Sequence, residues 1–460
     1  MTSRKDLIVH ELKRIDGQAP NERPGLTKHQ VMAANPFRFF RGSAQLFYAD
    51  LASGQLILPQ VLKDEAPLTT IIGDCHLSNF GFFTEEGAYG DSIIFAPNDF
   101  DDACMGLAAW DLVRFGVSLC LAAELGQGLI RGQYESDRVE DPEDYIAATV
   151  NEALEAVEDF INAYRMTCLV IADDSEHRLS ALNSFSSDHV LSGHAKKALT
   201  RAAGERKFLK KSSLAKAVDL SADKLRFRDR SDRFKRLSKS DYQQIEHTFR
   251  PYVDDHILDI VERIGAGTGS VNMSRYYLLV GPKPDHGPNP YRGPEDLGLC
   301  YLVEIKQQRE AAPIFFFPAL SPNNRLDPAH LTVDCQRRMQ RHPDIVLDDG
   351  IWQGKHWLIR SRHHARVSVA PEDIVLAKKT SAKKGKKSSG GSPAIALQEY
   401  AETCGQALAL AHARGDRRST RFERSMAKIL KSQVDTLVDC CRLYHNQVLE
   451  DWQLLNDCLS

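Results

Sequence analysis

The chain lacks the features that mark secreted and membrane proteins. Its first residues, MTSRKDLIVHELKRID, contain no apolar core of signal-peptide length, so we do not expect secretion. No uninterrupted apolar run is long enough to cross a membrane, and the nearest, LAAWDLVRFGVSLCLAAELG, is interrupted by Asp111 and Arg114. The ten cysteines include no CxxC pair, which argues against a zinc cage or a disulfide framework. We therefore expect a cytoplasmic protein with reduced thiols.

The chain also lacks a strong net charge. Its formal charge is −3 over 460 residues, which does not indicate a nucleic-acid or membrane-surface binder, and we expect no specific nucleic-acid partner. Hydrophobic residues make up 42% and charged residues 26%, an ordinary globular composition. A chain of this length exceeds one ordinary hydrophobic core, so two or three structural units are expected.

Changes in residue pattern divide the chain into six predicted segments. These are an N-terminal helical extension (1–30), a mixed region with the candidate catalytic residues (31–140), a helical and basic segment (141–250), a β-rich region (251–376), a lysine-rich linker (377–393) and C-terminal helices (394–460). The linker carries six lysines among small residues and cannot bury apolar surface, so we expect it to be disordered.

Two helices are expected around the candidate catalytic region. Residues 108–125 are apolar on most faces, which predicts a buried helix. Asp141 and Pro142 are expected to start an amphipathic helix, in which apolar residues recur at helical spacing from Ile146 to Tyr164.

Residues 206–236 are strongly basic, with twelve Lys or Arg residues against four Asp residues. They could form a patch for phosphate or nucleic acid, or solvated faces of helices and loops. Aromatic residues are sparse there, which argues against a base-stacking surface. We expect the solvated faces.

The polar groups that point to chemistry begin in the stretch IIGDCHLSNFGFF, residues 71–83. Asp74 and Asn79 lie five positions apart, Asp99 follows in NDFDD, and Asp111 follows in AAWDL. Two carboxylates and an amide oxygen are hard donors of the kind that Mg²⁺ selects. An Asp in a tight loop can also accept the proton of a substrate hydroxyl, so the set suits phosphoryl transfer from ATP.

These motifs resemble those of the protein-kinase-like superfamily, most closely its small-molecule branch, the aminoglycoside-phosphotransferase-like proteins. GDCHLSN is similar to the G-D-x-H-x-x-N catalytic loop of that branch, and NDFDD is similar to its metal-binding strand. The resemblance implies that Asp74 is the catalytic base and that His76 supports the loop beside it. It also implies that Asn79 and Asp99 are Mg²⁺ ligands and that Asp111 is a structural brace.

The chain is also similar to a bacterial family known as domain of unknown function 2252. The segments that carry this resemblance include FFRGSA, GDCHLSNFG, NDFDD, VDCQRRMQ and EYAETCGQALALAHARGD, and they extend from about residue 35 to residue 416. The resemblance supplies no activity, so the function must be argued from the site.

A nucleotide-binding half has to be sought after the catalytic residues, because the residues before Asp74 contain neither a glycine loop nor a suitable lysine. Gly265, Gly267 and Gly269 lie between two predicted strands, and YLVEIK ends a later strand at Lys306. This order resembles the kinase N-lobe. We therefore predict an α+β protein with a kinase-like two-lobed fold, circularly permuted and with extra helices.

The acidic partner of Lys306 is open at this stage. Asp334 in VDCQ is the first candidate and Glu310 is the second. Arg38 and Arg41 lie ahead of the catalytic loop in the sequence. They could bind a phosphate or an acidic substrate, or could pair with the acidic turn NDFDD, residues 98–102.

The sequence thus predicts a Mg²⁺-dependent phosphotransferase that uses ATP on a small-molecule or protein acceptor. Two alternatives remain: a silent ATP-binding pseudokinase, and a metal-dependent phosphoester hydrolase that uses Asp74 and His76. The hydrolase would need a G-N-H element, and no GNH occurs in the sequence. The acceptor, the choice between phosphoryl and adenylyl transfer, and the oligomeric state are not indicated.

Overall fold

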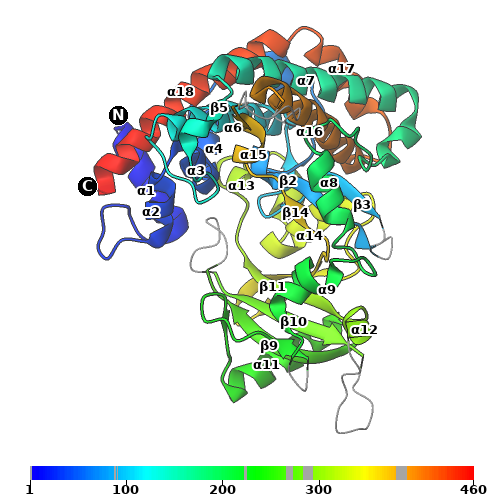
Figure 1. The fold of residues 1–460 in the computed structure, drawn as a ribbon. Coiled ribbons are helices and arrows are strands. Elements are labelled where there is room, and N and C mark those ends of the chain that lie inside the picture. The colour runs from blue at the N-terminus through cyan, green and yellow to red at the C-terminus, as the bar shows by residue number, and fades with distance from the viewer. Residues whose placement is uncertain are drawn as a thin grey trace.

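The computed structural model describes residues 3–86, 90, 92–221, 225–265, 273–282, 294–379 and 391–459. It is a mixed α and β structure, as the sequence predicts. In Figure 1 a large helical part lies above a smaller part that is built on a β-sheet.

The two ends of the chain meet in the helical part. The N-terminal helices are α1 (Arg4–Asp16), α2 (Thr27–Ala33), α3 (Pro36–Gly42), α4 (Ala44–Ser53) and α5 (Gln60–Asp64). Arg4 on α1 donates from Nε to Asp451 Oδ1 at 2.7 Å, and Asp451 lies on the last helix, α18 (Val434–Leu459). Figure 1 shows both termini on the same side of the molecule.

The predicted catalytic region is built of short strands and one long buried helix. The strands are β1 (Thr69–Ile71), β2 (Phe80–Thr84), β3 (Ile93–Pro97) and β4 (Cys104–Gly106), and β14 (Val367–Ser368) pairs with β2. We call residues 72–76 and the 3-10 turn η1 (Leu77–Asn79) the polar loop; η1 joins it to β2. Helix α6 (Ala108–Ile130) follows β4, so the buried helix expected at 108–125 is confirmed.

Helix α6 is the one helix in the described chain that is long and apolar enough to cross a membrane by composition. However, 83% of its most apolar stretch is buried inside the protein, which is typical of a core helix. All ten cysteines are free and buried, so none forms a disulfide.

The helix expected to begin at Asp141 begins later. Residues 142–144 form a 3-10 turn, and Tyr145–Ala147 form strand β5, which pairs with β15 (Leu376–Lys378). Helix α7 runs over Val150–Asp173, and Thr149 and Glu152 form a capping box at its start. Ile146 lies at helical spacing but belongs to strand β5. The helix begins at Val150, where the capping box of Thr149 and Glu152 satisfies the first free backbone amides.

Five helices pack together in the helical part. Helix α7 packs along α16 (Pro393–Gly415) and against α6, α17 (Arg421–Leu430) packs against α7, and α18 packs against α6 and α7. The lysine-rich stretch before α16 was predicted to be a disordered linker over 377–393. Its first residues belong to β15, its last residue begins α16, and residues 380–390 lie outside the described residues.

Helix α8 (Ser192–Leu199) packs against β2, β3 and β14. The basic segment and the residues after it add small elements to the sheet part: α9 (Phe208–Lys211), α10 (Ser213–Ala217), β6 (Val218–Asp219), β7 (Arg226–Phe227) and α11 (Lys239–Phe249). Several of its arginines form ion pairs with nearby acids; Arg230 pairs with Asp232, and Arg236 pairs with Asp229 and Asp259. These pairs at the surface agree with the expectation of solvated faces.

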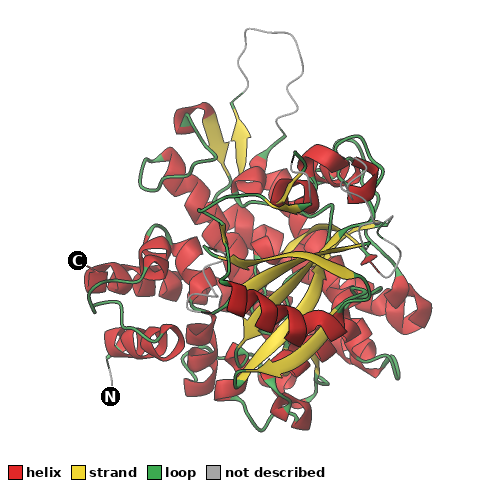
Figure 2. Cartoon of the chain, turned by 90° about the horizontal axis from the view of Figure 1, so that it is seen from below, coloured by secondary structure: helices red, strands yellow, loops and turns green. Residues whose placement is uncertain are grey.

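A six-stranded antiparallel sheet forms the lower part of the molecule. Its strands, in spatial order, are β12 (Leu347–Trp352), β13 (Lys355–Arg362), β11 (Tyr301–Gln308), β10 (Arg275–Gly281), β9 (His256–Arg263) and β8 (Phe234–Lys235). Further helices are α12 (Pro294–Leu297), α13 (Ala312–Phe316), α14 (Pro328–Met339) and α15 (Glu372–Val375). Figure 2 shows the sheet from below, with a helix lying across its outer face.

The two faces of the sheet differ because side chains alternate along each strand. On one face Leu278, Val303 and Ile305 pack against Ile245 and Phe249 of α11. On the other face Leu302 joins an apolar cluster at one end of β11, and Leu358 packs against Val333 of α14 at the other end. Between these two apolar patches the same face carries charged side chains, which reach the site described below.

The close packing of α16 against α7 predicts different effects for two glycine substitutions. A Cβ at Gly405 on α16 would lie 2.3 Å from the carbonyl oxygen of Phe160 on α7, whereas a Cβ at Gly193 on α8 would meet open space. We expect Gly405→Ala to lower the free energy of unfolding by about 2 kcal/mol. Gly193→Ala should not lower it, because alanine favours helix. Thermal unfolding of both variants measures this, and equal losses of stability would contradict the close packing.

Candidate functional site

A cavity of about 340 Å³ lies between the sheet and the helical part. Asp74 and Asn79 from the polar loop, Asp99 from the acidic turn, Gly265 after β9 and Lys306 on β11 all line it. Residues predicted as two separate groups in sequence therefore lie together in space. Gly267 and Gly269, predicted with Gly265 to form a phosphate loop, lie outside the described residues.

The polar loop is held by the carboxylate of Asp111, at the start of α6. One oxygen accepts from the backbone N–H of Ile72 at 2.7 Å, and the other accepts from that of Gly73 at 3.0 Å. His412 on α16 contacts Asp111 Oδ2 through Nε2 at 3.0 Å, and Tyr164 contacts the other ring nitrogen. Asp111 thus makes the contacts of a brace and is itself fixed by the C-terminal helices.

Gly73 allows this loop to meet the acidic turn. Its φ angle is +78°, a region that favours glycine, and a Cβ there would lie 1.9 Å from the backbone oxygen of Asp102. A side chain at position 73 would push the two segments apart. The close approach places Asp74 beside the acidic turn that carries Asp99.

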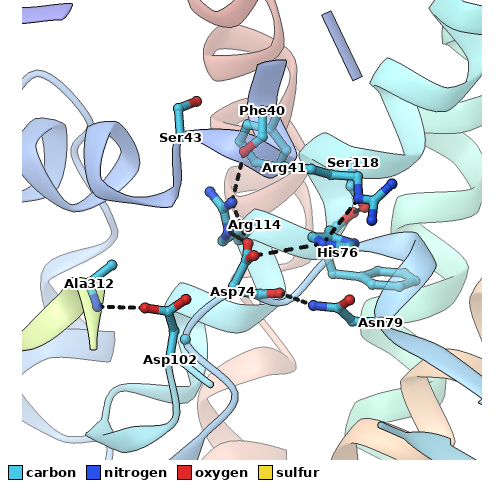
Figure 3. A network of polar contacts seen from close by, with 12 residues as sticks. Phe40, Arg41, Ser43, Asp74, His76, Asn79, Asp102, Arg114, Ser118 and Ala312 are labelled. Carbon is cyan, nitrogen blue, oxygen red and sulfur yellow. Dashed lines mark hydrogen bonds and ion pairs between the residues drawn. The ribbon is translucent and has the colours of Figure 1, made fainter. Parts of the chain in front are cut away.

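Asp74 is held by a buried arginine that sequence reasoning did not identify as a site residue. Arg114 on α6 donates to Asp74 Oδ1 from Nε at 2.9 Å and from Nη2 at 2.5 Å, and also to the carbonyl oxygen of Phe40 (Figure 3). Burial raises the pKa of the Asp74 carboxyl and Arg114 lowers it, and burial prevails. The signal was present in the sequence, since Arg114 interrupts an otherwise apolar helix.

His76 lies behind Asp74 and is buried. Its Nε2 is 3.7 Å from Asp74 Oδ2 and accepts from Arg41 Nε at 3.4 Å (Figure 3). Burial lowers the pKa of His76 well below its ordinary value, and the charges of Arg41 and Arg114 lower it further. A neutral imidazole in this position can support the loop. Of the two arginines singled out near it, Arg41 lines the cavity, whereas Arg38 is not among the lining residues.

Asn79 and Asp99 offer oxygen atoms suited to a hard cation. The amide nitrogen of Asn79 donates to the backbone oxygen of Asp74 at 2.8 Å, which leaves the amide oxygen for another ligand. Asp99 lines the cavity, and within the described part of the chain its Oδ1 has one hydrogen-bond contact, at 3.4 Å with the N–H of Asp101. No group of three or more acids, histidines or cysteines in the described chain forms a metal cage. A cation here would need further oxygens from its substrate, as Mg²⁺ on phosphates has.

The acid that contacts Lys306 is Asp101, in the acidic turn. Asp334, the expected partner, instead pairs with Arg338 one turn along α14 at 2.9 Å, and Glu310 is exposed beyond the end of β11. The expected pairing is therefore wrong, and Asp334 is not among the described residues that line the cavity. Burial lowers the pKa of Lys306 to about 7; the charge of Asp99 opposes this shift, and Arg360, Arg309 and Arg362 add to it.

The sheet contributes an arginine cluster that sequence reasoning also missed. Glu304 is buried on β11 and contacts Arg275 on β10 and Arg360 and Arg362 on β13, at 3.2, 3.0 and 2.9 Å. Burial alone would raise the pKa of Glu304, but the three arginines lower it below its ordinary value. Charged residues at alternate positions of apolar strands, as in EIK and RSR, were the available signal.

Positive charge predominates around the cavity. Five cationic side chains come from the sheet and its edge: Arg263, Arg275, Lys306, Arg360 and Arg362. Three more come from other segments: Arg41, Arg309 and Arg366. Among the described lining residues they face four carboxylates, Asp74, Asp99, Asp101 and Asp102. The acids gather at the polar loop and the acidic turn, so the cavity has an acidic side and a basic side that is suited to anions.

The brace predicts a large effect from a small change. Asp111→Asn would place an amide NH₂ opposite a backbone N–H or His412, so one buried donor would lose its acceptor. We expect a loss of about 3 kcal/mol in the free energy of unfolding. Asp334→Asn, which alters a half-exposed pair on α14, should cost less than about 0.5 kcal/mol. Denaturant unfolding of both variants measures the difference; similar small losses would show that the brace is unimportant.

The pKa of Lys306 predicts how stability changes with pH. Folded Lys306 releases its proton near pH 7, whereas an unfolded lysine releases it near pH 10.4, so unfolding takes up a proton between these values. The wild type should therefore gain stability relative to Lys306→Met as the pH rises from about 7 to about 10. Urea unfolding of both proteins at pH 6.5 and pH 9 measures this. Parallel changes in the two proteins would contradict the lowered pKa.

Comparison with known proteins identifies the family. No curated protein and no solved structure matches the chain. A family model described as "Uncharacterized protein conserved in bacteria (DUF2252)" matches residues 23–133 and 145–457. These ranges include the polar loop, the acidic turn, the sheet and the C-terminal helices, and they confirm the family resemblance seen in the sequence. The chain therefore belongs to the DUF2252 family of bacterial proteins.

Proposed function

We propose that this protein is a Mg²⁺-dependent, ATP-using phosphotransferase of kinase-like fold that acts on an unidentified hydroxyl acceptor. The observation that carries the proposal is the meeting of two groups of residues in one cavity. Asp74, Asn79 and Asp99 line its acidic side, and Lys306 reaches it from the sheet. Lys306 contacts Asp101 across 205 positions of sequence.

The order of elements supports a kinase-like arrangement. Strands β9 and β10 are antiparallel neighbours, β11 carries the lysine, α14 follows, and β13 pairs with β11. This is the order of loop, lysine strand, helix and further strand in a kinase N-lobe. On the other side, the polar loop leads into the β2–β3 pair, the acidic turn and α6.

A circular permutation would explain the reversed order of the two halves. Permutation requires termini that lie close together, and α1 and α18 are in contact through Arg4 and Asp451. The C-terminal part also completes the catalytic half, because Thr69 on β1 donates to the backbone oxygen of His412 on α16 at 2.7 Å.

In the proposed reaction Asp74 orients the acceptor hydroxyl and takes its proton as the oxygen–phosphorus bond forms and the bond to ADP breaks. Arg114 occupies one oxygen of Asp74, so Oδ2 is the atom that meets the hydroxyl. The Asn79 amide oxygen and the Asp99 carboxylate would hold Mg²⁺, which supplies positive charge to the phosphates. Lys306 and the backbone at Gly265 would contact ATP. Catalysis then consists of placement and charge stabilisation.

A catalytically silent ATP-binding protein is the second candidate. It is favoured by one observation: Asp334 on α14 pairs with Arg338, and Lys306 is paired instead with the acidic turn.

A phosphoester hydrolase has less support, because His76 is buried, neutral and engaged with Arg41. A cytoplasmic location is part of the proposal in either case; free cysteines and a buried α6 support it.

Three substitutions test the proposed function. Thermal unfolding with ATP and Mg²⁺ measures binding, and transfer of radiolabelled γ-phosphate to a mixture of small alcohols and proteins measures activity. Asp74→Asn should reduce transfer at least about 100-fold while ATP affinity stays within about threefold. Asp99→Asn should remove the Mg²⁺ dependence of binding, and Lys306→Ala should weaken ATP binding. Asp334→Asn, which lies outside the cavity lining, is the matched control.

Different results separate the candidates. A wild-type protein that is not stabilised by ATP and Mg²⁺ contradicts both the phosphotransferase and the silent ATP-binding protein. ATP binding without any transfer, unaffected by Asp74→Asn, favours the silent protein. If Asp99→Asn loses ATP binding and Lys306→Ala does not, the acidic residues remain part of the nucleotide site and Lys306 does not.

A further inference from the structure

The basic side of the cavity is built on the sheet. In antiparallel strands paired residues point to the same face, and Tyr277, Glu304 and Arg360 form one such row across β10, β11 and β13. Arg275 and Lys306 form the next row, and Arg362 lies two positions beyond Arg360. The inner face of three adjacent strands thus turns guanidinium groups towards the cavity, and buried Glu304 fixes them in place.

The guanidinium groups of Arg275, Arg360 and Arg362 share the carboxylate of Glu304, and the charges of Asp99 and Asp344 also act on Arg360. Arg366, on the segment after β13, adds a further cation, and its hydrogen bond is to the neutral amide oxygen of Asn98 at 3.3 Å. Burial together with the charges of Arg362 and Arg360 lowers the pKa of Arg366 to about 10, against the opposing charges of Asp99 and Glu304. An anion bound beside these groups would relieve their mutual repulsion.

The described residues of this region offer little apolar surface for a nucleobase. Pockets that hold a flat aromatic ligand are lined mainly by apolar and aromatic side chains. Here Tyr277 and Met273 are the large apolar groups among the described lining residues. The guanidinium of Arg362 lies over the Tyr277 ring, 5.1 Å from its centroid. A base at this position would meet charged groups in place of an apolar slot.

We propose that the sheet side of the cavity is a binding subsite for a polyphosphorylated small molecule, whose phosphate groups contact Arg360, Arg362 and Arg366. The subsite deepens the proposed phosphotransferase and rests on it only for the assignment of Asp99 and Lys306 to the transferred group. Arginine suits this role because its planar guanidinium donates two parallel hydrogen bonds to one phosphate.

The shared chemistry is a set of phosphate groups close together, on a linear chain or on a ring. Binding is therefore measured by isothermal titration calorimetry with inorganic tripolyphosphate, inositol hexakisphosphate, ATP and adenosine, each with and without Mg²⁺. Tripolyphosphate represents the linear source and inositol hexakisphosphate the cyclic one. We expect at least one of these two to bind without Mg²⁺ and at least tenfold more tightly than ATP, and we expect no binding of adenosine.

Arginine substitutions locate the binding. Arg366→Gln and Arg362→Gln should each weaken the tighter polyphosphate at least tenfold, because each removes a charged contact. Arg366→Gln leaves the three contacts to Glu304 intact, so it remains informative if Arg362→Gln folds poorly. Arg206→Gln, an exposed arginine in the basic segment, is the matched control for non-specific attraction and should bind as the wild type does.

Two results would overturn the subsite. One is a polyphosphate affinity that Arg366→Gln and Arg362→Gln leave unchanged. The other is competition of adenosine with ATP, which would show that the cavity binds a nucleobase. Asp99→Asn separates this failure from failure of the proposed function. If Asp99→Asn changes neither Mg²⁺ dependence nor any transfer, while Arg366→Gln still weakens polyphosphate, the subsite stands and the phosphotransferase does not.

Discussion

The site depends on one buried carboxylate. Asp111 accepts hydrogen bonds from two successive backbone amides of the polar loop and a contact from His412, so it ties that loop to helices from both ends of the chain. Buried backbone donors need an acceptor, and here a single side chain supplies it for the segment that precedes Asp74. Gly73 then allows the loop to touch the acidic turn. The positions of Asp74 and Asp99 relative to each other follow from these contacts.

The second organising feature is the contact between the two halves. Lys306 meets Asp101, and Gln308 on the same strand donates to the backbone oxygen of Asp101 at 2.7 Å. The sheet is thereby fixed against the acidic turn, with the cavity beside the joint. The acids then lie on one side of the cavity and the arginines on the other. Such an arrangement favours a ligand with an anionic body and a reacting group at the acidic end.

Local patterns in the sequence predicted much of this arrangement. Alternation identified the strands around Lys306, the apolar run identified α6, and the spacing of Asp74, Asn79 and Asp99 identified the acidic side. Pairings between distant residues could not be read in the same way. Asp334 was expected to pair with Lys306, but it pairs with Arg338 on its own helix, and Asp101 from the acidic turn contacts Lys306 instead. Arg114 and Glu304 were missed because a buried charge shows its role only through its tertiary partner. Helix α7 begins later than the apolar periodicity predicts, because the Thr149–Glu152 capping box, and not the apolar spacing at Ile146, fixes its first turn.

The contact between Asp111 and His412 spans 301 positions, and Tyr400 donates to the backbone oxygen of Leu77 across 323. On a ribosome the polar loop emerges long before α16, which follows it by more than 300 positions. The loop therefore has no complete support until α16 has been translated. A chain that stalls before α16 would carry every acidic residue of the site and still lack the support that orders them.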